Sequence, residues 1–474
     1  MKRAATTFFA MYILIVIIGS SVPAAARPTS DGGSPGPRGG AAWVARYDGP
    51  AHVMDRPEAM AVDSAGNVYV TGGTIVGNND WDYATVKYSP GGIQRWAKTY
   101  GYNKSGTASK LDYANGLALD SAGNIYVTGQ SAAAHGWPRF ATIKYTPLGS
   151  RTWVARSGFG GASTSCVAKA LAVDRSGNVY VTGWRFLHDS DVCTKKDFAT
   201  AKYTTTGGLV WKRTYDTSAH GDDEAVAIGV DAGRNAYVAG YETQYYSGRN
   251  LRMIKYSSTG TKLWTKWYNA PPNGRDAATA LTIVHRGTLM VPITEVAVVG
   301  YSKVTATGYD CVTMVVKTDA TTRWVKRFEG QALITNVRPV AVASDSAGNV
   351  YVAASGDCGG FFTLKYDVAG NLVWLRSYNG GLGNDYARAI AVDNAKNVYV
   401  TGQSQAGCNS FDYITIKYSA AGNKIWERRY DGTAHGYDCP EAIAVDNAGS
   451  VYVTGYSAGV GTSDDYVTIK YTAD

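Results

Sequence analysis

The sequence lacks every short motif that would assign it a reaction. It has no H-E-x-x-H zinc motif, no G-x-S-x-G nucleophile elbow and no glycine-rich phosphate-binding loop. Its six cysteines form no C-x-x-C pair, which argues against a zinc or thioredoxin-type site. These absences leave no residue assigned to catalysis, to a metal or to a cofactor. Carboxylate pairs of the glycosidase type stay open, because their separation depends on the fold.

Long apolar runs and helical periodicity are also scarce. No stretch shows the 3.6-residue apolar period of an amphipathic helix, which excludes a helical solenoid. After residues 8–18, no apolar segment is long enough to span a membrane. The formal net charge of +8 is modest for 474 residues and is spread along the chain without a nucleic-acid-binding motif. We therefore expect no nucleic-acid partner and no membrane span in the mature chain.

What the sequence does contain is one repeated phrase, AMAVDSAGNVYVTG, at Ala59 to Gly72. Two runs rich in β-branched and aromatic residues flank Ser64-Ala65-Gly66, a pattern typical of a β-hairpin whose glycine is left-handed. The side chain of Asp63 is expected to bond backbone N–H groups of this turn. Seven further copies follow at intervals of 48 to 61 residues, at Gly116–Gly129, Ala170–Gly183, Ala227–Gly240, Ala280–Gly300, Ala341–Ala354, Ala389–Gly402 and Ala442–Gly455.

The fifth copy is degraded and has a longer turn containing Pro292. Two other copies carry Arg234 and Lys396 where the turn glycine is expected. If the turn is unchanged, each of these residues takes a left-handed conformation at a cost of roughly 1 kcal/mol.

Each repeat continues with two more predicted strands. The third reads D-[YF]-x-T-x-K-Y, as at Asp82–Tyr88, and the fourth carries a tryptophan, such as Trp96. Both faces of these strands are apolar or small, as in sheets covered by neighbours on both sides. Four antiparallel strands per repeat predict a β-propeller blade. The fold class we predict is an all-β, single closed propeller of eight four-stranded blades over residues 41–474.

The two ends of the repeat region predict how the ring closes. The last repeat contains only three strands, while a lone tryptophan strand, Trp43–Tyr47, precedes the first. We predict that this N-terminal strand completes the eighth blade, which removes the exposed sheet edges of an open ring. We expect a monomer.

The repeat resembles the bacterial SBBP-type β-propeller repeat. Three sequence patterns carry the resemblance: D-x-x-G-N-V-Y-V-T-G, D-[YF]-x-T-x-K-Y and G-x-x-x-W. The resemblance covers essentially all of residues 41–474 and is weakest in the fifth unit. It implies a propeller in an extracytoplasmic or surface setting, and no single activity, because propellers host many functions. The family is often described as seven-bladed, whereas this sequence contains eight units.

Residues 1–26 have the features of a secretory signal peptide: Lys2 and Arg3, an apolar run from Phe8 to Ile18, and three alanines ending at Ala26. Residues 27–40 form a linker rich in proline, glycine and serine, which we expect to be disordered. We therefore predict a secreted or extracytoplasmic protein, at the cell surface or in the periplasm. An uncleaved membrane anchor is the alternative.

The connections between predicted strands alternate between short and long, so one face of the disc collects the variable loops, where function usually lies. An aspartate stands four residues before the phrase in six repeats: Asp55, Asp112, Asp223, Asp276, Asp385 and Asp438. These carboxylates are expected to ring the central opening, where they could bind a polyol or a cation such as calcium. The alternative is that each one bonds nearby loop N–H groups as a cap.

Aromatic residues also occur in the predicted long loops, namely Trp81, Trp137, Trp184, Tyr245 and Tyr246. They could stack on sugar rings or anchor a protein, or else pack over the blade edges.

Six cysteines allow fifteen pairings. Export and an even count favour disulfides, and the repeat geometry suggests Cys166–Cys193, Cys311–Cys358 and Cys408–Cys439.

These features favour a secreted, disulfide-supported scaffold that binds a protein or a cell-surface glycan through its long-loop face. One alternative is a propeller enzyme, a polysaccharide lyase or hydrolase with its site at the axial opening. Another is a purely structural surface module.

Overall fold

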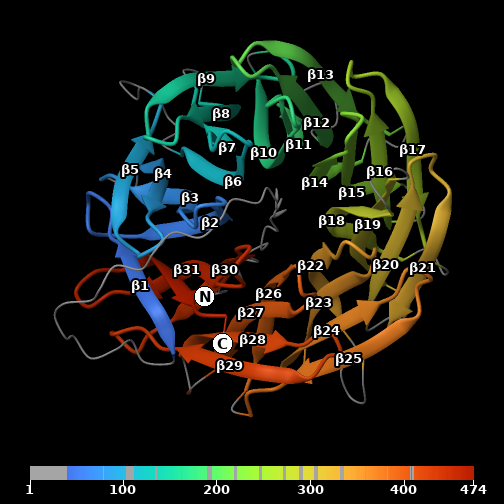
Figure 1. Ribbon diagram of the computed structural model, residues 1–474. Coiled ribbons are helices and arrows are strands. Elements are labelled where there is room, and N and C mark those ends of the chain that lie inside the picture. Colours follow the sequence, from blue (N-terminus) through green and yellow to red (C-terminus); the bar gives the residue numbers. More distant parts are fainter. Residues whose placement is uncertain are drawn as a thin grey trace, which may run out of the picture.

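The computed structural model describes residues 40–77, 80–102, 111–133, 136–161, 163–188, 195–217, 221–244, 248–270, 274–287, 292–303, 308–330, 336–357, 359–381, 383–405, 407 and 410–473. The regular elements in these segments are all strands, which form eight antiparallel sheets of four. Figure 1 shows the sheets arranged as blades around one axis. The predicted eight-bladed propeller is confirmed.

The first two strands of each blade form the hairpin of the repeated phrase. The innermost strands are β2 (Asp55–Val62), β6 (Tyr113–Leu119), β10 (Thr164–Val173), β14 (Glu224–Val230), β18 (Asp276–Gly287), β22 (Arg338–Ser344), β26 (Asp385–Val392) and β30 (Asp438–Val445). The second strands are β3 (Val68–Ile75), β7 (Ile125–Ser131), β11 (Val179–Leu187), β15 (Ala236–Gln244), β19 (Pro292–Lys303), β23 (Val350–Gly356), β27 (Val398–Gln405) and β31 (Val451–Ala458).

The outer half of each blade comes from the other two motifs. The third strands are β4 (Trp81–Tyr88), β8 (Arg139–Tyr145), β12 (Lys196–Tyr203), β16 (Gly248–Tyr256), β20 (Tyr309–Lys317), β24 (Gly360–Tyr366), β28 (Phe411–Tyr418) and β32 (Asp464–Tyr471). The outermost strands are β5 (Gln94–Tyr100), β9 (Arg151–Ser157), β13 (Leu209–Tyr215), β17 (Lys262–Tyr268), β21 (Thr322–Phe328), β25 (Leu372–Tyr378), β29 (Lys424–Tyr430) and β1 (Ala41–Tyr47).

The ring closes as predicted. Strand β1 pairs antiparallel with β32, with Val44 opposite Ile469 and Tyr47 opposite Tyr466. The eighth sheet therefore has the order β1-β32-β31-β30. In Figure 1 the blue strand β1 lies at the rim beside the red C-terminal strands. We number the blades in chain order, so that blade 1 begins with β2 and blade 8 with β30.

The hairpin turn also matches its prediction. Gly66 is left-handed, with φ at 78°, and the Asp63 carboxylate accepts from the backbone N–H of Asn67 at 2.9 Å. Arg234 and Lys396 take the same conformation, with φ at 63° and 66°. The turn thus keeps its shape where the glycine is missing, because the aspartate and the flanking strands hold it.

Neighbouring blades are joined through the tryptophan and lysine of the repeat. Trp96 Nε1 and Lys87 Nζ both donate to the Pro147 carbonyl in the next blade, at 3.2 and 3.0 Å. The other indoles that bond the next blade are Trp43 to Pro90, Trp153 to Thr205, Trp211 to Ser258, Trp264 to Thr318, Trp324 to Val368 and Trp374 to Ala420. Trp426 Nε1 is buried without an acceptor in the described part of the chain.

The hydrophobic core lies between blades rather than inside one sheet. Tyr69 and Tyr83 of blade 1, for example, pack in one cluster with Ile125 and Val127 of blade 2. Eight such clusters follow one another around the ring. Every sheet is therefore covered on both faces, which explains why the strands have no polar side.

The predicted signal peptide, residues 1–26, lies outside the described residues, as does the predicted linker apart from Gly40. In the part of the chain that is described, no helix has the length and apolar character needed to cross a membrane.

Candidate functional site

The six predicted aspartates all stand at or just before the first residue of an innermost strand, on the long-loop side, and all are buried. Each accepts from a backbone N–H of the connection that leads into its blade: Gly49 to Asp55 at 2.6 Å, Tyr102 to Asp112 at 3.2 Å, Thr217 to Asp223 at 3.1 Å, Ala270 to Asp276 at 3.1 Å, Gly380 to Asp385 at 2.7 Å and Gly432 to Asp438 at 2.6 Å. This is the capping arrangement, which satisfies loop donors that would otherwise be buried unpaired. The ligand role of these residues stays a prediction.

Burial changes the acidity of these caps. It raises the pKa of Asp55 and of Asp438 to about 6, and that of Asp223 to about 7. The backbone N–H groups act in the opposite direction, since they favour the charged carboxylate.

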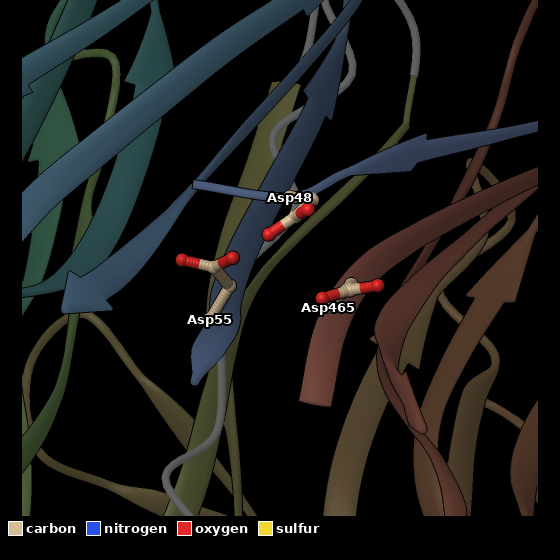
Figure 2. A group of neighbouring side chains, drawn as sticks. All are labelled: Asp48, Asp55 and Asp465. Atoms are coloured by element: carbon tan, nitrogen blue, oxygen red, sulfur yellow. The ribbon is translucent and has the colours of Figure 1, made fainter. Parts of the chain in front are cut away.

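Two of the capping aspartates, Asp55 and Asp438, each lie near two other carboxylates, at two different junctions between blades. Figure 2 shows Asp55 of blade 1 facing Asp48 and Asp465 of blade 8, and oxygens of all three lie within 4.8 Å of one another. Arg46 pairs with Asp465 at 2.7 Å and His52 Nδ1 contacts Asp48 at 2.6 Å.

The equivalent residues Asp412, Asp431 and Asp438 form a second group between blades 7 and 8. There, Arg429 pairs with Asp412 at 3.0 Å and His435 contacts Asp431 at 2.5 Å. Within the described residues, these two groups lie at blade junctions, each with its own arginine.

The predicted aromatics have different settings. Trp81 packs on Tyr113 with ring centroids 5.4 Å apart, and Lys196 Nζ lies 4.6 Å from the ring centroid of Trp184. Trp137 is 36% exposed and stacks on His188. Tyr245 and Tyr246 lie outside the described residues.

A second set of aromatics was not predicted. Tyr386, Phe411, Tyr437 and Tyr456 follow one another in ring contact across blades 7 and 8, with centroids 6.2, 5.3 and 6.1 Å apart. The Arg56 guanidinium of blade 1 continues the row, 4.8 Å from the Tyr456 ring centroid. All five side chains are partly exposed at or near strand ends on the long-loop face. We call these five residues the aromatic strip.

The cysteine pairs are not shown. Cys166, Cys311 and Cys439 are buried, and no two of them are bonded to each other. Their predicted partners, Cys193, Cys358 and Cys408, all lie outside the described residues. The three disulfides therefore stay a prediction.

The innermost strands share a feature that was not predicted. Each has a β-bulge at the residue just before the repeated phrase. The glycine that ends the phrase makes room for the bulge: a Cβ on Gly72 would lie 2.0 Å from the Arg56 carbonyl oxygen. In blades 1 to 8 the bulge residues are Glu58, Asn115, Lys169, Val226, Thr279, Val340, Arg388 and Glu441.

Four charged bulge residues are coupled electrostatically around the axis. The charge of Glu441, in the next blade, raises the pKa of Glu58, whereas Lys169 and Arg388, each two blades away, lower it. Burial outweighs these cations and raises the pKa of Glu58 to about 8. Burial also raises the pKa of Glu441. We call Arg388, Glu441, Glu58 and Lys169 the charged arc.

A cavity of about 310 Å³ extends from two of these residues, Arg388 and Glu441, along the inner strands. Arg388 and Glu441 lie at one end, and the exposed Ser346 of the β22–β23 turn lies at the other. Between them the walls are mainly apolar, and include Ile283, Val342 and Ile390. Its size falls at the lower end of the range for small-molecule sites, about 300–1,000 Å³. The axial cavity is therefore large enough to hold a small molecule.

The bulge residues could have been found in the sequence. The position just before the phrase is polar or charged in six of the eight repeats, although the inner strands are otherwise mainly apolar. The glycine that ends the phrase was a second signal, because a close backbone approach is a usual reason for a glycine in a strand.

Comparison with known proteins supports the architecture and gives no activity. No curated protein matches the sequence. Among solved structures, Sqt1 from Chaetomium thermophilum has a TM-score of 0.55 at 10% identity, with 92% of this chain and 100% of that one covered. The polysaccharide lyase Uly1 (TM-score 0.43, 9% identity, 80% and 93% covered) and the β-propeller domain of the Trilobed protease from Pyrococcus furiosus (0.39, 8%, 80% and 97%) are more distant. At such identities the likeness to Sqt1 shows the fold alone.

The family comparison identifies the repeat itself. Residues 96–135, 152–184 and 373–407 match the SBBP model, described as a beta-propeller repeat. These segments lie in blades 1 to 3 and 6 to 7, and each runs from a tryptophan strand through the inner hairpin of the next blade. The chain is thus an eight-bladed β-propeller that contains SBBP repeats.

Proposed function

We propose that this propeller is an exported binding protein that holds a glycan on its long-loop face, with the aromatic strip as the platform. The observation that carries the proposal is the unbroken row from Tyr386 through Tyr456 to Arg56. Flat aromatic faces stack on the apolar faces of sugar rings, and tyrosine hydroxyl groups can bond the sugar hydroxyls at the edge.

The platform is also preorganised. Tyr437 and Tyr456 lie nearly parallel, with 15° between their rings. Arg56 is fixed by Asp464 at 2.9 Å as well as by the Tyr456 ring. Because these side chains lie at or next to strand ends, little conformational entropy is lost when a ligand binds.

The test is a glycan array followed by affinity measurements on the glycans retained. We expect Tyr456→Ala to weaken binding by about tenfold or more, as for a central aromatic contact. Trp267→Ala is the matched control, because Trp267 is 57% exposed on the outermost strand β17, and it should bind as the wild type does. Unchanged binding by Tyr456→Ala, or retention of a protein partner instead of any glycan, would contradict the proposal.

The same glycans distinguish a binding protein from an enzyme. Prolonged incubation should leave them intact if the protein only binds. Cleavage lost in Glu441→Gln would instead support the polysaccharide lyase or hydrolase alternative, with its site at the axial cavity.

Export is part of the proposal and has separate tests. We expect the secreted protein to begin near Arg27 when its N-terminus is sequenced, as a cleaved signal peptide requires. Non-reducing peptide mapping should find the three predicted disulfides. Three or more free thiols would contradict them.

A further inference from the structure

We propose that the charged arc and the axial cavity bind a small zwitterion with an apolar body, of the class of a free α-amino acid with an apolar side chain. The site lies along the inner strands and shares no residue with the aromatic strip, so the inference goes beyond the glycan platform and does not rest on it.

The first argument is the order of charges. Arg388, Glu441 and Glu58 project from successive blades 7, 8 and 1, and Lys169 follows from blade 3. A purely anionic ligand would meet the two glutamates, and a purely cationic one would meet Arg388 and Lys169. A ligand that carries both charges close together can place its cation at the glutamates and its anion at Arg388 or Lys169. Such pairing is needed because a charge that is partly withdrawn from water is costly unless an opposite charge lies beside it.

The second argument is hydrogen-bond chemistry. Glu58 Oε1 already accepts from the Tyr113 hydroxyl at 2.8 Å, and the adjacent Glu441 lies at the cavity end. An ammonium group has three donors and can bridge two neighbouring carboxylates. The Arg388 guanidinium, which donates to Gln403 Oε1 at 3.0 Å, has a planar fork of five donors that matches a carboxylate.

The third argument is the space beyond the charges. The side chain of an amino acid held at Arg388 and Glu441 would extend along walls that include Ile283, Val342 and Ile390. Burying apolar surface there is favourable at roughly 25 cal/mol per Å². The volume of about 310 Å³ suits a single apolar side chain rather than a polymer.

The opposite arc of the same ring shows that the charges are not needed for the fold. Blades 4, 5 and 6 have Val226, Thr279 and Val340 at the same bulge. Because the backbone accepts these uncharged residues, the charged arc is not a requirement of blade packing.

The experiment is calorimetric titration of the full chain with L-leucine, L-phenylalanine, glycine, N-acetyl-leucine and leucine amide. We expect leucine or phenylalanine to bind, and either capped form or glycine to bind at least about tenfold more weakly, since each lacks one charge or the apolar body. Equal binding by a capped form, or no binding by either apolar amino acid, would overturn the proposal.

Two further measurements keep the test independent of any one variant. Arg388→Gln and Glu441→Gln should each lose leucine binding, whereas Thr279→Val on the opposite arc should keep it, with folding checked by circular dichroism. Binding at pH 7 should also release about one proton, because the ligand ammonium displaces the proton held at Glu58. The charged and titratable groups that act on Glu58 are Glu441, Tyr113, Lys169 and Arg388. The proton release is measured as the dependence of the binding heat on the ionisation enthalpy of the buffer. Loss of binding in Thr279→Val, or no proton release, would contradict the assignment.

Discussion

The inner strands of all eight blades share the same bulge, but its residue is charged in blades 7, 8, 1 and 3 and uncharged in blades 4, 5 and 6. The bulge presents Arg388 and Glu441 in blades 7 and 8, but Val226 and Val340 in blades 4 and 6. The residues that build the blade recur around the ring, namely the turn aspartate, the paired threonines and the tryptophan that bonds the next blade. The shared positions therefore maintain the scaffold, whereas the position that varies at the axis is available for a ligand.

The largest loss of stability should come from opening the ring at blade 8, which carries Glu441. Deleting Ala41 to Asp48 removes β1 and exposes the edge of β32 in blade 8, the blade that carries Glu441 on β30. We expect aggregation or a melting temperature lower by at least about 10 °C, because an unpaired strand edge and lost core contacts both result. Thermal unfolding measures the effect. Deletion of the linker residues 27–39 is the control and should change nothing, and equal melting of the two deletions would contradict the closure of the ring by β1.

A scaffold aspartate should matter to stability more than a residue of the charged arc does. The Asp223 carboxylate accepts from the N–H groups of Thr217 at 3.1 Å and Thr243 at 2.9 Å. Asp223→Ala leaves both donors buried and unpaired, which should lower the free energy of unfolding by about 2–3 kcal/mol in denaturant titrations. Glu441→Gln should cost less than about 1 kcal/mol by the same measurement, because it keeps its shape and faces the cavity. A larger loss in Glu441→Gln than in Asp223→Ala would reverse our division between scaffold and site.

The smallest effect concerns the bonds between blades. Trp96→Phe keeps an aromatic ring but removes the bond to the Pro147 carbonyl, so it should cost about 1 kcal/mol in addition to the change in packing. Trp426→Phe is a matched control, because that indole N–H has no acceptor in the described part of the chain. The difference between the two losses, measured by chemical denaturation, should be about 1 kcal/mol. Equal losses would show that the indole bond does not stabilise the blade junction.

The sequence predicted the fold because its determinants are local and repeated. The turn built on Asp63, the tryptophan strands and the unpaired strand Trp43–Tyr47 were enough to give eight blades and their closure. Even the left-handed conformations of Arg234 and Lys396 followed from the copies. None of these inferences requires knowing which side chains meet across the axis.

The candidate site could be predicted only in part. Asp55 was expected at the central opening, but its side chain turns into the blade junction and caps Gly49. The bulge adds one residue to each inner strand and so changes which positions after Asp55 face the axis. Period-two alternation in the sequence does not reveal such an insertion. The electrostatic effect on Glu58 of charges two blades away is a property of the closed ring alone.

The most direct test of the account is the pH dependence of unfolding in wild type and Glu58→Gln. The carboxyl pKa of Glu58 is raised from 4.5 to about 8 on folding, so between these values the folded state holds a proton that the unfolded state has lost. The stability contributed by that proton is therefore complete below about pH 4.5 and is lost as the pH rises through 8. Caps such as Asp223 titrate in both proteins and cancel in the difference. We predict that the free energy of unfolding falls more steeply from pH 5 to 8 in the wild type than in Glu58→Gln. Parallel curves would contradict a proton held at the charged arc.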